Sequence, residues 1–303
     1  MKRLTRVAIC MIMAFFTLVL TEVITAQTFT FDSGSDESDG ALDYTPFAPA
    51  QGEDPVTVIF DPTKPETFDH PANPDASRRL DLDGDNVFHF TTITIPAGVT
   101  VRMRADTSLG ARAVHWLASG AVQIDGVIDL NGESGRSAPI SSTSAVAGAG
   151  GYGGGIGGTS DYSPIRGFGP GGGGSGNGAH GGGGGYKTAG GTGNFPAASG
   201  GSAYGNDFLL PLLGGSGGGG GANSGDNSGG AGGAGGGALL IASSTSITVN
   251  GAITARGGNG GAGVFGGGGG SAGGIRLMAP VIGGTGSLNA ARGAAGPDST
   301  STL

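Results

Sequence analysis

Cysteine, charge and long apolar runs are all scarce in this 303-residue chain. The one cysteine, Cys10, lies inside the N-terminal apolar run, so a disulfide framework is excluded. Charged residues make up 13% of the chain and acidic ones outnumber basic ones, with a formal net charge of −8. That balance argues against binding to nucleic acid, because nucleic-acid binders need a basic face. Stability must therefore come from backbone hydrogen bonds, apolar packing or bound ions.

The N-terminal residues 1–26 are typical of a signal peptide. Lys2, Arg3 and Arg6 precede an apolar run at 7–20, and Ala26 is a small residue suited to cleavage. The run is shorter than the roughly 20 residues needed to span a membrane, although an uncleaved anchor is the alternative interpretation. We therefore expect a secreted bacterial protein, extracellular or at the cell surface, with no membrane insertion after signal removal.

Four further regions follow the signal peptide. Residues 27–86 form an acidic N-terminal segment, and residues 87–147 alternate β-branched and polar residues as strands do. In the tract 148–237, 42 of the 90 residues are glycine. Strand patterns return over 238–303, around a second glycine-rich insertion. No ordinary globular domain has this composition.

An internal repeat carries the fold prediction. The residues 124–132 (IDGVIDLNG) match 249–257 (VNGAITARG) and, more loosely, 284–293 (GTGSLNAARG). Each copy follows an apolar strand ending in a small residue, at 114–118, 239–242 and 275–279. A unit of this size cannot bury its own apolar face, so the units are expected to stack. The pattern predicts an all-β fold, a short right-handed parallel β-solenoid.

The same repeat, together with the run from Phe88 to Val101 and that from Trp116 to Gly132, resembles uncharacterised secreted bacterial glycine-rich proteins with parallel β-helix-like repeats. The resemblance covers most of the chain after the signal peptide. It implies an architecture and no particular activity.

The glycine tract 148–237 has two competing interpretations. It could be a flexible coil, since glycine-rich segments bury too little surface to offset their ordering entropy. It could instead form extended polyglycine-II-like helices, which have three residues per turn and bond to their neighbours. The apolar interruptions, such as 208–213, favour order, because exposed apolar groups invite aggregation. We therefore expect a glycine-rich layer attached to the solenoid.

Asp81, Asp83 and Asp85 are the candidate metal ligands. Carboxylates on alternate residues of a turning loop can converge on Ca²⁺, which takes six to eight oxygens. The EF-hand pattern fails here, so the alternative is an acidic solvated turn before the strand at Val87. The histidines are scattered and predict no zinc site; they are His70, His89, His115 and His180.

No residue is predicted to be catalytic or to bind an organic cofactor. The leading hypothesis is a non-catalytic extracellular structural or adhesive protein that presents a rigid repeat surface to extracellular polysaccharide or a cell-surface component. Tyr152, Tyr162 and Tyr186 would stack on sugar rings. Exposed strand edges also predict self-association.

The alternative function is a polysaccharide lyase or glycoside hydrolase of β-helix type. Asp125 and Asp129 are four residues apart in a strand region and so point the same way. Several arginines could line the same face; they are Arg102, Arg104, Arg256, Arg276 and Arg292.

Overall fold

The computed structural model describes residues 30–69, 72, 74–176, 178–194 and 198–299. The predicted signal peptide, 1–26, and His70 lie outside these residues. The chain divides into two compact units, 1–31 and 32–303, and all the described strands belong to the second. Among the described residues, no helix is both long and apolar enough to cross a membrane.

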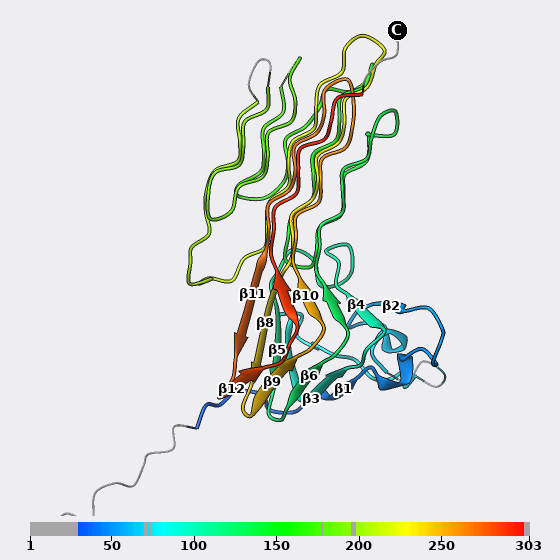
Figure 1. Ribbon diagram of the computed structural model, residues 1–303, viewed down its shortest axis with the longest axis vertical. Helices are drawn as coiled ribbons and strands as arrows, with labels where there is room; N and C mark the ends of the chain where they lie inside the picture. Colours follow the sequence, from blue (N-terminus) through cyan, green and yellow to red (C-terminus); the bar gives the residue numbers. More distant parts are fainter. Residues whose placement is uncertain (1–29, 70–71, 73, 177, 195–197, 300–303) are drawn as a thin grey trace, which may run out of the picture. The chain divides into compact units, whose positions relative to one another are not determined.

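Within the described ranges, the regular structure consists of thirteen strands and two single-turn 3₁₀ helices (Figure 1). The strands are β1 (Gly40–Asp43), β2 (Val56–Ile59), β3 (Val87–Ile95), β4 (Val99–Arg102), β5 (Val114–Ala118), β6 (Val122–Ile124), β7 (Val127–Asp129), β8 (Ala238–Ser243), β9 (Ser246–Val249), β10 (Ala252–Thr254), β11 (Gly274–Met278), β12 (Val281–Gly283) and β13 (Ser287–Asn289). The helices are η1 (Thr45–Phe47) and η2 (Pro65–Thr67).

The strands form two all-parallel sheets. One has eight strands, seven of them in the order β11-β8-β5-β3-β6-β9-β12, with β1 paired to β3. The other has five, in the order β13-β10-β7-β4-β2. The first half of β3 pairs with β5 and its second half with β6. Because β1 pairs with Phe90, Ile93 and Thr94 on the other edge of β3, β5 and β6 share one edge of that strand.

This arrangement corrects the predicted fold. The strands are all β and parallel, but the predicted architecture, a short right-handed parallel β-solenoid with a glycine-rich (polyglycine-II-like) layer attached to it, is wrong. Seven strands instead form one nearly closed, barrel-shaped sheet, and the glycine-rich residues continue directly from the strands. The repeat predicts which strands pair, but the curl of a sheet accumulates over many neighbours and has no local sequence signal.

The three repeat copies pair in register within the smaller sheet. Ile128 of β7 lies opposite Ile253 of β10, which lies opposite Leu288 of β13. The first two side chains are fully buried, whereas Leu288 is 54% exposed because no strand follows β13 in the sheet order. The last copy therefore leaves an apolar edge open.

Aromatic side chains fill the centre of the strand region. Phe60 contacts the rings of Phe88 and Trp116 at centroid distances of 5.6 and 5.7 Å, and all three are fully buried. Alternate residues of β3 and β5 point inward, which is the period-two pattern of strands with one buried face. The strand region therefore has a conventional apolar core.

The described residues of the glycine-rich ranges 131–237, 255–273 and 290–298 form a second kind of structure, named here the glycine bundle. Figure 1 shows its extended segments running on from β8, β10 and β11 and lying side by side. Backbone hydrogen bonds join them throughout, so the flexible-coil interpretation is wrong for the described residues.

The segment 215–222 shows how the glycine bundle is bonded. Its amide donors fall into three sets: Gly215, Gly218 and Gly221 donate to 230–236, Gly219 and Ala222 to 179–182, and Gly217 and Gly220 to 165–168. Apart from Ser216, whose amide donates to the Ser271 hydroxyl, every third amide thus meets the same neighbour. This is expected for an extended backbone with three residues per turn and no internal bonds.

Glycine is required where these segments approach one another. A Cβ built on Gly220 would overlap the carbonyl oxygen of Ile156, and one on Gly201 would overlap that of Gly171. The backbones therefore pack with no room for a side chain between them, so that buried backbone groups pair without a β-ladder.

Candidate functional site

The predicted metal ligands come together on the surface. Asp81, Asp83 and Asp85 each place one carboxylate oxygen within 4.8 Å of the others. Burial, with the neighbouring carboxylates adding to it, raises the pKa of Asp81, although its oxygens already accept hydrogen bonds from the amides of Asp85 and Asn86. Exposed acidic groups often gather without an ion, so Ca²⁺ binding stays a prediction. A Ca²⁺-dependent rise in melting temperature that Asp83→Asn abolishes would support it.

The two carboxylates of the enzyme alternative are held by separate partners. Asp125 accepts hydrogen bonds from Gln123 at 2.7 Å and from Asn250 at 2.8 Å. Asp129 accepts one from the amide of Asn131 at 2.8 Å and lies 3.9 Å from the guanidinium of Arg102. Neither arrangement presents a carboxylate pair to a shared reacting atom.

The arginines of the enzyme alternative likewise have separate partners and do not gather at one site. Arg102 and Arg104 both contact Glu133, and Arg104 also makes two 2.8 Å hydrogen bonds to Asp106. The hydrogen bond from Arg104 to Asp106 lowers the pKa of that carboxyl group. Arg256, Arg276 and Arg292 form no ion pair with any described carboxylate.

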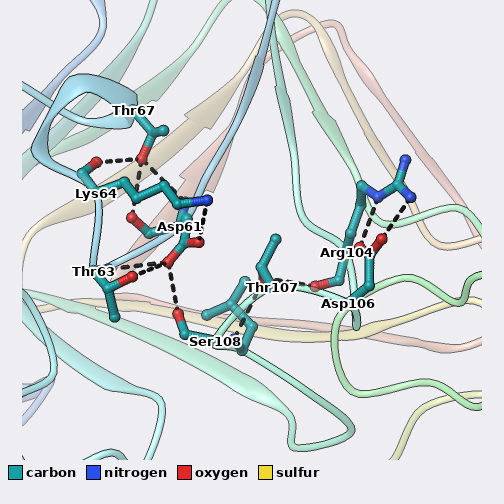
Figure 2. Close-up of polar contacts among 9 residues, drawn as sticks. Asp61, Thr63, Lys64, Thr67, Arg104, Asp106, Thr107 and Ser108 are labelled. Atoms are coloured by element: carbon teal, nitrogen blue, oxygen red, sulfur yellow. Dashed lines mark hydrogen bonds and ion pairs between the residues drawn. The ribbon is translucent and has the colours of Figure 1, made fainter.

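Asp61 is the most buried of the described carboxylates, at 5% exposed, and sequence reasoning missed it. Figure 2 shows its carboxylate between Thr63, Lys64 and Ser108. One oxygen accepts the Thr63 and Ser108 hydroxyls at 2.7 and 2.8 Å, and the other lies 3.3 Å from the Lys64 ammonium. Burial alone would raise the pKa of Asp61, but these hydrogen bonds outweigh it and the pKa is lowered. The residue ties the loop after β2 to the loop after β4.

Of the three tyrosines predicted to meet sugar rings, Tyr162 is 62% exposed, whereas Tyr152 and Tyr186 are partly buried. The ring of Tyr152 packs against Gly169. Tyr186 is half-buried, packs edge-on to Tyr204 and donates its hydroxyl hydrogen to the Leu213 carbonyl. The last two are structural parts of the glycine bundle.

Two further apolar side chains join Tyr162 at intervals of three residues. Ile165 is 37% exposed and Phe168 is 48% exposed. Their amides donate to Ile156 and Gly153 at 3.2 and 3.0 Å, that is, to the same neighbouring segment. At about 3.1 Å rise per residue, Ile165 and Phe168 follow one another about 9 Å apart along one face. Tyr162 lies in the bend just before them, where its amide donates to the Thr159 hydroxyl. We call Tyr162, Ile165 and Phe168 the apolar stripe.

A shallow polar groove of about 510 Å³ adjoins the apolar stripe. Ile165 and the exposed Arg166 line one side, and Ser199 and Ser202 line the other. Arg166 forms no ion pair with a described residue. The groove therefore offers hydroxyl groups and one free guanidinium beside apolar faces.

Sequence reasoning found Tyr162 but not its two companions. The signal that could have found them is the spacing of the bulky residues, since 162, 165 and 168 share one face only in a backbone with three residues per turn. Comparisons with protein-family models, with curated proteins and with solved structures found no match to this chain.

Proposed function

We propose that the protein is a non-catalytic extracellular protein, structural or adhesive, that binds linear carbohydrate along the apolar stripe. The observation that carries the proposal is a set of three exposed apolar side chains at intervals of three residues, of which Ile165 and Phe168 are bonded to the same neighbouring segment. The extracellular location rests on the predicted signal peptide.

The chemistry of the surface suits sugar rings. Aromatic faces take up large apolar area and leave polar groups at their rim, and a sugar ring has a matching apolar face and polar edge. Arg166, Ser199 and Ser202 lie close enough to the stripe to serve hydroxyl groups of a bound sugar. The many donors of a guanidinium are suited to that role.

The stripe is held rigidly before any ligand arrives. The amides of Ile165 and Phe168 are bonded to one neighbour, and their carbonyls accept from Gly220 and Gly217 of another at 2.9 and 3.0 Å. A ligand therefore pays little to order this surface, which favours affinity. Adhesion to an extended polymer needs such a fixed row of contacts.

The test is co-sedimentation of the purified protein with insoluble polysaccharides, followed by titration with soluble oligosaccharides of those that bind. Tyr162→Ala and Phe168→Ala should each weaken binding by about tenfold, because each removes one of the two aromatic contacts of the stripe. The matched control is Phe208→Ala, which removes a ring that is 80% exposed outside the stripe.

Binding that survives both stripe substitutions would contradict the proposal. Release of reducing ends or unsaturated uronides during the incubation would instead favour the hydrolase or lyase alternative.

A further inference from the structure

A second and larger groove, of about 980 Å³, opens between segments of the glycine bundle. Its walls come from the segments 180–186, 188–194, 265–273 and 290–298, and most of the lining residues are glycine or alanine. It is separate from the apolar stripe, none of whose residues lines it.

The segment 265–273 has one unused set of amides. Following the three-residue period, Gly267, Gly270 and Gly273 donate to the segment 255–261, whereas Gly268 and Ser271 donate to 216–219. The third set contains Gly269 and Ala272, which line the groove. Their amides donate to no described residue.

The carbonyls of the same segment are, by contrast, used in all three directions. They accept from 181–184, from 230–236 and from 293–296. The segment 265–273 therefore has five hydrogen-bonded neighbours, and the free amides mark the direction of a missing sixth.

The segment 180–186, on another wall of the groove, also lacks one hydrogen-bonded neighbour. Its amides donate to 265–273, to 171–174 and to 188–191, and its carbonyls accept from 201–204 and from Gly219. The carbonyls of Gly181 and Gly184, which both line the groove, accept from no described residue. This segment too has five neighbours, and the unused carbonyls are three residues apart.

We propose that the groove is a vacant position of the glycine bundle and binds a glycine-rich, extended polypeptide strand of another chain. Such a strand would accept from the amides of Gly269 and Ala272 and donate to the carbonyls of Gly181 and Gly184. A backbone of three residues per turn repeats about every 9 Å, which matches the spacing of both unused sets.

A polypeptide fits these walls better than a sugar polymer does. One wall supplies amide donors and another supplies carbonyl acceptors, and both sets recur every three residues. A peptide backbone complements them with its own C=O and N–H groups. Two aromatic rings line the described part of the groove, and both already have partners: Tyr186 packs against Tyr204 and His180 against Phe265. Side chains larger than alanine would meet the neighbouring backbone, so the strand must be rich in glycine.

Polar side chains limit the length of the site. At one end, the ring Nδ1 of His180 lies 3.4 Å from the Asp298 carboxylate, which links the segments 180–186 and 290–298. Lys187 and Asp207 form an ion pair elsewhere on the lining. The bound strand must therefore run between these pairs or displace them.

The test uses a fluorescent, end-blocked peptide of four Gly-Gly-Ser repeats, titrated into the full-length protein. Saturable binding is expected, and it should slow hydrogen exchange at Gly269 and Ala272. The amide of Gly218, which is already bonded to Gly233 at 2.9 Å, reports on the fold and should not change. A peptide of Gly-Val-Ser repeats should bind at least about tenfold more weakly, because valine clashes with the walls.

Two matched variants locate the binding. Ala295 is exposed and lines the groove, so Ala295→Trp should fill it and weaken binding by at least about tenfold. Ala291 is exposed on the same segment outside the lining, and Ala291→Trp should leave binding unchanged.

Three results would overturn the proposal: no binding at millimolar peptide, equal binding to both variants, or binding that leaves exchange at Gly269 and Ala272 unaltered. Protection of these two amides by a soluble oligosaccharide but not by the peptide would assign the groove to a glycan. The carbohydrate proposal above stands or falls separately, on Tyr162 and Phe168.

Discussion

The strand region and the glycine bundle are two parts of one chain that are stabilised in opposite ways. In the strand region, large side chains such as Trp116 and Phe88 are removed from water, and backbone pairing serves to align them. In the glycine bundle, the backbone itself fills the interior, and a side chain at most buried positions would overlap a neighbour. The strand region is therefore sensitive to substitutions that remove side-chain volume, whereas the glycine bundle is sensitive to substitutions that add it.

The comparison also explains how the chain dispenses with disulfides. A hydrogen bond contributes a modest net free energy, roughly 1 kcal/mol, but a buried group left unpaired costs more. In the segment 215–222, the donors and acceptors serve neighbours in several directions. Each segment is therefore tied into a network instead of a single ladder.

The largest expected effect is in the strand region. Trp116→Ala should lower the free energy of unfolding by about 4 kcal/mol, because it leaves a cavity beside Phe60 and Phe90. Urea denaturation measures the loss. Leu288→Ala on the open edge is the control and should cost less than about 1 kcal/mol, since Leu288 is mostly exposed. Similar losses in the two variants would contradict the apolar core.

Adding one methyl group tests the glycine bundle. Gly220→Ala should lower the free energy of unfolding by about 3 kcal/mol, because the new Cβ overlaps the carbonyl of Ile156. A Cβ at Gly191 would meet nothing within 4 Å, so Gly191→Ala should be neutral or stabilise by about 0.5 kcal/mol through the unfolded state. Thermal melts of both variants give the comparison. Equal effects would mean that the segments are not closely packed.

A smaller effect, dependent on pH, is expected from Asp61. The pKa of Asp61 is lower in the folded protein than in the unfolded chain, where it has the ordinary aspartate value of about 3.9. The ionised carboxylate therefore stabilises the fold above that value, and this stabilisation is lost as the pH falls through the lower pKa of the folded state. Asp61→Asn should cost about 1–2 kcal/mol at pH 7, and the difference from wild type should shrink at acidic pH. Urea denaturation at several pH values checks this. A difference that grows on acidification would show the opposite sign of shift.

Sequence reasoning identified the strands better than their assembly. Alternation predicts β3, β4 and β5 close to their observed bounds, because one buried face imposes a period of two. The repeat predicts the pairing of β7 with β10 and of β10 with β13. The nearly closed shape of the larger sheet was missed, since the curl of a sheet accumulates over many neighbouring strands and has no local sequence signal.

The candidate sites show the same limit. Tyr162 was predicted, whereas Ile165 and Phe168 were not, because their common face depends on a backbone period that composition does not reveal. Tyr152 and Tyr186 were assigned to the surface, but the glycine bundle needs their rings as packing. The larger groove has no sequence signal, because it consists of backbone groups whose neighbours come from distant segments.

In the glycine bundle, the direction in which an amide points depends on its position within the three-residue bonding period. Deleting one residue within 215–222 would rotate every later amide by a third of a turn, so that Gly218 and Gly221 would no longer face 230–236. Adding or removing three residues would leave each later amide facing its original neighbour and would change only the length of the segment. Natural variants of such segments should therefore differ in length by multiples of three, while the turns that join them vary freely.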